Sequence, residues 1–142
     1  WKFNIVTGEC KEESMSETCA EFPMINGRHA GRRHRYSYNA RCAPGLFAFD
    51  GLIKHDLDTG SEDLYEFEPG VFISETVMAP KEGAVAEDDG YLVTFSSDMN
   101  RDLSEALIFD AADPTEGPIC QIRLPERICS GTHSTWASAS DL

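Results

Sequence analysis

The stretch Gly45–Phe67, GLFAFDGLIKHDLDTGSEDLYEF, has the pattern of two β-strands joined by a tight turn. Its first part, Gly45–Leu57, is rich in apolar residues, and its second part, Ser61–Phe67, alternates between polar and apolar residues. Between them, Asp58-Thr59-Gly60 contains residue types that favour turns. The stretch therefore predicts a β-hairpin, and similar patterns recur along the rest of the chain.

These further strand patterns lie on both sides of the hairpin, each bounded by Gly, Pro, Asp or Asn. They cover Trp1–Val6, Glu9–Met15, Gly70–Met78, Tyr91–Ser96, Glu105–Phe109 and Pro118–Leu124. No window shows a sustained helical spacing of apolar residues, so we expect an all-β fold. One short helical turn is expected at Asp98–Leu103, with Asp98 as its cap.

The turns at Thr7-Gly8, Thr59-Gly60 and Asp113–Gly117 recur at intervals slightly longer than the ~40–50 residues of a propeller blade. Strand–turn–strand units at such a spacing favour blades of a β-propeller. A general antiparallel β domain with coincidental turn spacing is the alternative.

The charge and the cysteines of the chain exclude some functions. The 142 residues include 25 acidic and 12 basic side chains, a net charge of −13, so we expect no general electrostatic binding of nucleic acid. The five cysteines show no CxxC spacing, which argues against a zinc ribbon or a thioredoxin-type motif. Reduced cysteines in a cytoplasmic protein are the simplest interpretation.

The chain begins at Trp1, inside a strand pattern and without an initiator methionine. We therefore expect residues 1–142 to be part of one domain of a longer polypeptide. A functional site in this chain would then contain only some of its members.

Two charged segments interrupt the strands. Five of the twelve basic residues lie between Arg28 and Arg41, and an ion-paired or solvated loop is the expected interpretation. Glu87-Asp88-Asp89 precedes Gly90 without the spacing of an EF-hand, so we expect a charged turn there, with a divalent-cation loop as the weaker alternative.

The chain has four histidines and neither an HExxH motif nor a GxSxG motif. His29, His34 and His55 are expected to be ordinary surface or core residues, and His55 to face water. His133 differs because small residues surround it in Cys129-Ser130-Gly131-Thr132-His133-Ser134. A neutral imidazole held in a tight, dry turn suits iron, zinc or copper, so ligation by His133 is one of two open interpretations.

Four stretches in order resemble the C-terminal part of the carotenoid cleavage oxygenase family, which includes apocarotenoid and lignostilbene dioxygenases. Glu21–Asn26, EFPMIN, is followed by Gly31–Tyr38, and Gly51–Gly60 is similar to a strand and turn of the family. The third stretch runs from Ser74-Glu75 through Pro80 to Glu87–Tyr91, and the last leads from Leu124–Arg127 to His133 and Trp136. Thr132 and Ser134, which flank His133, depart from the family pattern and leave the subfamily open.

The resemblance implies a seven-bladed β-propeller that holds one non-haem Fe(II) with four histidines on its axis. It implies that His133 is the last iron ligand and that Glu21 and Glu75 are two of the glutamates that hydrogen-bond iron-ligating histidines. The other three histidine ligands and a further glutamate would lie before Trp1. The fold expected for this chain is therefore the C-terminal blades of a propeller.

The activity implied by the resemblance is O2-dependent cleavage of a conjugated carbon–carbon double bond in a carotenoid, apocarotenoid or stilbene. The partners would be O2 and a small apolar conjugated substrate, with membrane association possible but not through this segment. We expect the fragment alone to be inactive, since one histidine cannot hold the iron. A non-catalytic propeller module for protein binding and a small acidic β-protein with an accidental resemblance are the alternatives.

Overall fold

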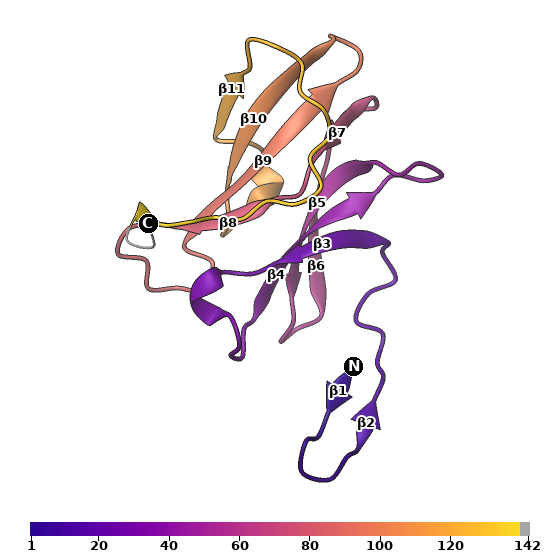
Figure 1. Ribbon diagram of the computed structural model, residues 1–142, viewed down its shortest axis with the longest axis vertical. Coiled ribbons are helices and arrows are strands. Elements are labelled where there is room, and N and C mark those ends of the chain that lie inside the picture. The colour runs from indigo at the N-terminus through magenta and orange to yellow at the C-terminus, as the bar shows by residue number, and fades with distance from the viewer. Residues whose placement is uncertain (140–142) are drawn as a thin grey trace.

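The computed structural model describes residues 1–139 and consists almost entirely of β-strands (Figure 1). One sheet contains β3 (Ala20–Met24), β4 (Tyr36–Cys42), β5 (Phe49–Asp56) and β6 (Ser61–Glu66), in that order. The hairpin predicted within Gly45–Phe67 is confirmed, because β5 and β6 pair antiparallel from Asp56↔Ser61 to Gly51↔Glu66.

The second sheet follows directly in the chain. It contains β7 (Val71–Ile73), β8 (Val77–Pro80), β9 (Gly90–Asp98), β10 (Leu103–Asp110) and β11 (Cys120–Arg123). Both β7 and β8 pair with β9, and β10 and β11 follow outward. If β7 and β8 are counted as one interrupted strand, the strands of each sheet that are neighbours in sequence are neighbours in space, which is the arrangement of a propeller blade.

Apolar side chains from both sheets form the core where the sheets meet. Tyr38 and Leu52 come from the first sheet and Ile73, Leu92 and Phe109 from the second, and all five are almost completely buried. The Tyr38 hydroxyl donates a hydrogen bond to the carbonyl of Ala111, 3.1 Å away, so the two sheets are also joined by polar contacts.

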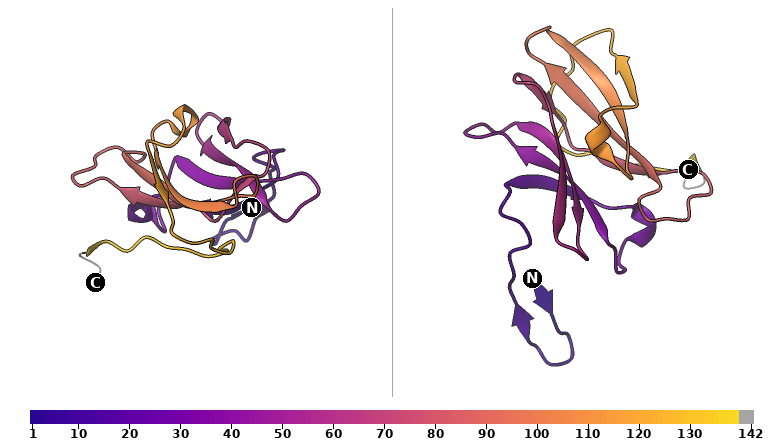
Figure 2. Two further views of the ribbon diagram at one scale, coloured as in Figure 1. Left: turned by 90° about the horizontal axis from the view of Figure 1, so that it is seen from above. Right: turned by 180° about the vertical axis from the view of Figure 1, so that it is seen from behind.

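Three sequence expectations were wrong in detail. No strand was expected between Met15 and Gly45, where β3 and β4 form half of the first sheet. The expected helical turn at Asp98–Leu103 is the turn of the β9–β10 hairpin, where Asp98 Oδ1 accepts hydrogen bonds from the backbone N–H groups of Asn100 and Arg101. The strand patterns at Trp1–Val6 and Glu9–Met15 form only the short hairpin β1 (Lys2–Phe3) and β2 (Cys10–Lys11). This hairpin projects away from the two sheets (Figures 1 and 2), so few long-range contacts extend its pairing.

The helices of residues 1–139 are the short 3₁₀ turns η1 (Gly27–His29) and η2 (Pro114–Glu116). Neither they nor any other helix in this part of the chain is long and apolar enough to cross a bilayer.

Candidate functional site

Glu75 lies in a bulge between β7 and β8, the two strands that pair with β9 along the same edge. β7 ends its pairing at Ile73↔Ser96, and β8 resumes at Val77↔Val93. Three residues, 74–76, therefore oppose two residues, 94 and 95, of β9. An extra residue in one strand redirects the side chains around it, and such bulges are frequent beside functional sites. Thr94 stabilises this one, because its hydroxyl donates to the carbonyl of Ser74 over 3.1 Å.

The bulge places Glu75 beside the C-terminal segment. Glu75 Oε2 lies 3.5 Å from Nδ1 of His133 and accepts a hydrogen bond of 2.7 Å from the backbone N–H of Ser134. The Glu75 side chain is 10% exposed. A carboxylate at this position favours the proton of the imidazole on Nδ1 and leaves the lone pair on Nε2, as ligand-orienting carboxylates do.

Phe22 contacts the same imidazole. Its ring meets the His133 ring edge to face, with centroids 5.8 Å apart, and meets buried Phe49 at 5.0 Å. A second bulge sets this position, since β3 and β4 pair at Glu21↔Ala40 and again at Met24↔Tyr38. Phe22 has a φ of 56°, in the left-handed region that non-glycine residues rarely adopt.

Sequence reasoning did not identify Phe22 as a site residue. The available signal was Pro23, which lacks an N–H and so cannot complete the β3–β4 ladder. A proline in the middle of β3 indicates a bulge in its pairing with β4. Which side chain the bulge directs toward His133 depends on the second sheet.

Glu21 lies on β3 next to this bulge and is exposed. Within residues 1–139, no hydrogen bond or ion pair joins its carboxylate to another side chain. The structure therefore brings Glu75 and His133 together, while Glu21 lies on β3 of the first sheet and has no histidine partner within residues 1–139.

The surroundings of His133 differ from those expected. Its side chain is 85% exposed, and the segment 127–138 is extended, with no turn at Gly131. A Cβ on Gly131 would meet only the Cβ of Ser74, at an ordinary 3.9 Å. The expected tight turn was therefore wrong: the extended segment is positioned by Glu75 through Ser134, not by a bend.

His55 was expected to face water, and this was wrong as well. Its side chain is 13% exposed, with Nδ1 2.8 Å from the Asn39 amide nitrogen and Nε2 3.1 Å from Glu62. Thr18 donates to the other oxygen of Glu62 at 2.8 Å. His55 lies on a central strand where its neighbours supply polar partners, and sequence alternation alone could not show this.

The basic segment is ion-paired, as one of its two interpretations predicted, and its arginines pair with acids of the β5–β6 hairpin. The acidic triplet has other partners. Glu87 accepts hydrogen bonds from the backbone N–H groups of Arg35 and Tyr36, Asp88 pairs with Lys54, and Asp89 pairs with Lys81. Each of the three acidic side chains therefore has a different partner. Among residues 1–139, no group of three or more His, Cys, Asp or Glu side chains could hold a metal ion.

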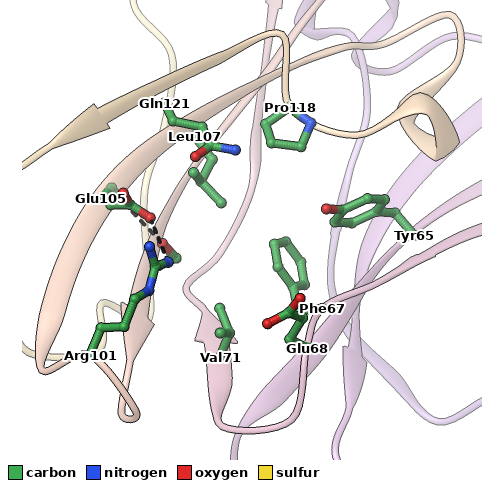
Figure 3. Close-up of a pocket in the computed structure, with 10 residues that line it drawn as sticks. Tyr65, Phe67, Glu68, Val71, Arg101, Glu105, Leu107, Pro118 and Gln121 are labelled. Atoms are coloured by element: carbon green, nitrogen blue, oxygen red, sulfur yellow. Dashed lines mark hydrogen bonds and ion pairs between the residues drawn. The ribbon is translucent and has the colours of Figure 1, made fainter.

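A cavity of about 400 Å³ lies elsewhere, between β6 of the first sheet and the strands of the second sheet (Figure 3). Figure 3 shows Tyr65, Phe67 and Leu107 on its walls and the ion pair of Arg101 with Glu105 beside it. None of its lining residues belongs to the pair of Glu75 and His133, so the cavity is separate from that pair.

Residues 1–138 match the family described as Retinal pigment epithelial membrane protein. The chain is 34% identical over 96% of its length to the apocarotenoid-15,15'-oxygenase of Synechocystis, and 33% identical over 99% to the carotenoid 9,10(9',10')-cleavage dioxygenase 1 of Phaseolus vulgaris. It covers 29% and 28% of those two proteins, less than a third of each.

Solved structures give the same result. The cobalt-substituted Synechocystis apocarotenoid oxygenase superposes with a TM-score of 0.90 at 30% identity, over 96% of this chain and 29% of that one. The lignostilbene dioxygenase of Pseudomonas brassicacearum superposes with a TM-score of 0.81 at 25% identity, over 87% and 28%. The two sheets are thus blades of a β-propeller of this type, and the chain belongs to the family of the retinal pigment epithelial membrane protein and the carotenoid cleavage oxygenases.

Proposed function

We propose that this chain is the C-terminal part of a single-domain propeller oxygenase that uses Fe(II) and O2 to cleave a conjugated carbon–carbon double bond. The substrate class would be a carotenoid, an apocarotenoid or a stilbene, the classes named for the relatives of this chain. The observation that carries the proposal is the contact of Glu75 with His133, a carboxylate beside the Nδ1 of a histidine on a C-terminal segment.

The residues present fit part of a metal site. His133 would supply one imidazole ligand through Nε2, and Glu75 would fix the ring and keep the proton on Nδ1. Phe22 would restrain the ring through its edge-to-face contact. Glu21 would serve a second histidine, one outside this chain, which accounts for its position beside the bulge of β3 and its lack of a partner within residues 1–139.

The iron would supply redox chemistry and binding positions for O2 when bound. The residues of this chain would only hold and orient a ligand, so neither Glu21 nor Glu75 needs to contact the substrate. The exposure of His133 agrees with a ligand whose metal and partner ligands belong to other segments. The cobalt-substituted form of the Synechocystis relative supports a metal site of this kind.

The isolated chain would then be inactive, because one imidazole does not retain Fe(II) against water and chelators. In the cell we place the complete protein in the cytoplasm, where the five free thiols stay reduced.

The test compares wild type, His133→Ala and His34→Ala in the full-length protein. Metal per chain is measured by elemental analysis, and oxygen-dependent cleavage by chromatography of a stilbene and apocarotenoid panel. We expect His133→Ala to lose metal and cleavage while circular dichroism stays β-rich, and His34→Ala to keep both. Full metal content and normal cleavage in His133→Ala would overturn the proposal.

A further inference from the structure

Two cysteines lie opposite each other at the end of the β3–β4 pair. The pair Ala20↔Arg41 places Cys19 and Cys42 one step further along the same two strands. The backbone N–H of Cys42 donates a 2.9 Å hydrogen bond to the carbonyl of Cys19, so the strands are still paired at this step. Side chains that oppose each other on antiparallel strands project from the same face of the sheet.

This arrangement brings the two thiols within bonding range. Opposed residues on antiparallel strands have Cα atoms about 4.5–5.5 Å apart, and a disulfide needs about 4.4–6.8 Å. No large movement of the backbone is therefore required to join them. Both cysteines are free in the structure.

The two thiols differ in access and in acidity. Cys19 is exposed, whereas Cys42 is half-buried. Burial raises the pKa of the Cys42 thiol to about 11, and the neighbouring Cys19 side chain adds to the shift. An exposed thiol is the better first nucleophile. The raised pKa makes Cys42 itself slow to react with peroxide, and its position beside Cys19 suits it to the second step.

We propose that Cys19 and Cys42 form a peroxide-reactive dithiol site, which closes to a reversible intramolecular disulfide. In the first step the Cys19 thiolate attacks hydrogen peroxide: an S–O bond forms, the O–O bond breaks, and hydroxide leaves and is protonated to water. In the second step the Cys42 thiol loses its proton and attacks the Cys19 sulfur. The S–S bond forms, the S–O bond breaks, and a second water leaves.

The site has a structural consequence near Glu21. Cys19 directly precedes β3, still paired with Cys42, and lies two residues from Glu21, so the two side chains project from the same face. A disulfide would fix the end of the strand that positions this glutamate. Transient disulfides of this kind occur in compartments that keep thiols reduced, and a thiol reductant reverses them. The inference does not depend on the proposed oxygenase function.

Peptide mapping of the purified protein tests the proposal. The folded protein is treated with hydrogen peroxide, blocked with N-ethylmaleimide and digested with trypsin without reductant. Cys19 falls in the peptide Glu12–Arg28 and Cys42 in Cys42–Lys54, each with no other cysteine. We expect these two peptides to appear linked, lighter than their sum by two hydrogen atoms, and to separate after dithiothreitol.

Three controls make the result specific. Cys42→Ser should leave Cys19 as a sulfenic acid that dimedone labels, Cys120→Ser should leave the linked peptide unchanged, and urea-unfolded protein should give several-fold less of it. The linked species should also run as a monomer on a non-reducing gel. The proposal is overturned if Cys19 is oxidised without linkage to Cys42, or if linkage is as frequent in urea as in the folded protein.

Discussion

Glu75 Oε2 lies 3.5 Å from Nδ1 of His133, although the two residues are separated by most of the second sheet in sequence. The same oxygen accepts the N–H of Ser134, so one carboxylate fixes both the backbone and the ring of the C-terminal segment. Glu75 therefore has two roles, to hold the backbone and to orient the ring, and substitutions can test each role separately.

Glu75→Gln in the full-length protein should weaken metal binding and leave the segment in place. The amide oxygen can still accept from Ser134, but the charge that stabilises the imidazole is lost, which typically costs ~10–100-fold in metal affinity or activity. Cobalt titration measures the affinity, and cleavage assays the rate. Glu21→Gln should behave in the same way, and exposed Glu82→Gln is the matched control. Unchanged cobalt affinity in both Gln variants would contradict the roles given to the two glutamates.

Lys54 should be the most important ion-pairing residue for stability. Its side chain is 6% exposed, and Nζ contacts both Asp88 at 2.8 Å and the carbonyl of Ala112 at 2.6 Å, which ties β5 to two loops of the second sheet. Lys54→Met leaves the 19% exposed Asp88 without its partner, so we expect a loss of about 3 kcal/mol in the free energy of unfolding.

Urea unfolding measures this loss, with Arg33→Met as the control. The pair of Arg33 with Asp58 is largely exposed and screened by solvent, so its removal should cost much less than that of the Lys54 pair. Equal losses in the two variants would show that burial of the Lys54 pair contributes nothing.

His55→Ala should destabilise the protein, in contrast to the expectation from sequence. The change removes the 2.8 Å hydrogen bond between Nδ1 of His55 and the buried Asn39 amide, and one such hydrogen bond contributes about 0.5–1.5 kcal/mol. Thermal unfolding followed by circular dichroism reports the shift. His34→Ala, which loses only a 3.3 Å contact with the carbonyl of Arg32, should stay close to wild type. A wild-type melting temperature for His55→Ala would refute this role.

Asp98→Asn should give a stability loss that depends on pH. Hydrogen bonds from the backbone N–H and the guanidinium of Arg101 lower the pKa of the Asp98 carboxyl in the folded protein. The stabilisation is therefore fully present above the unfolded pKa of about 3.9 and disappears as the pH falls through the lower folded pKa.

The difference in unfolding free energy between wild type and Asp98→Asn should thus be constant from neutral pH to about pH 5 and shrink below about pH 4. Urea unfolding at a series of pH values measures it, with exposed Asp63→Asn on β6 as the control. A difference that stays the same down to pH 3 would rule out the effect of the Arg101 hydrogen bonds.

The sequence determined the local structure wherever alternation and turn residues agreed. The hairpin of β5 and β6 follows from the apolar run before Asp58-Thr59-Gly60 and the alternation after it, because both signals depend only on neighbouring residues. The all-β class and the strands from Phe49 onward follow for the same reason, whereas β3 and β4 were not expected from the sequence. The motifs around Glu21, Glu75 and His133 are sufficient to identify the family.

Only the tertiary structure decided how the candidate site is assembled. The sequence suggested a bend at Gly131, whereas His133 lies on an extended segment. The bulge at 74–76 redirects the carboxylate of Glu75, which holds this segment through the N–H of Ser134. The burial of His55 and the ring contact of Phe22 likewise come from strands that are distant in sequence. Such contacts depend on which sheets stack and on where a ladder gains an extra residue, and these are properties of long-range pairing that a local pattern does not specify.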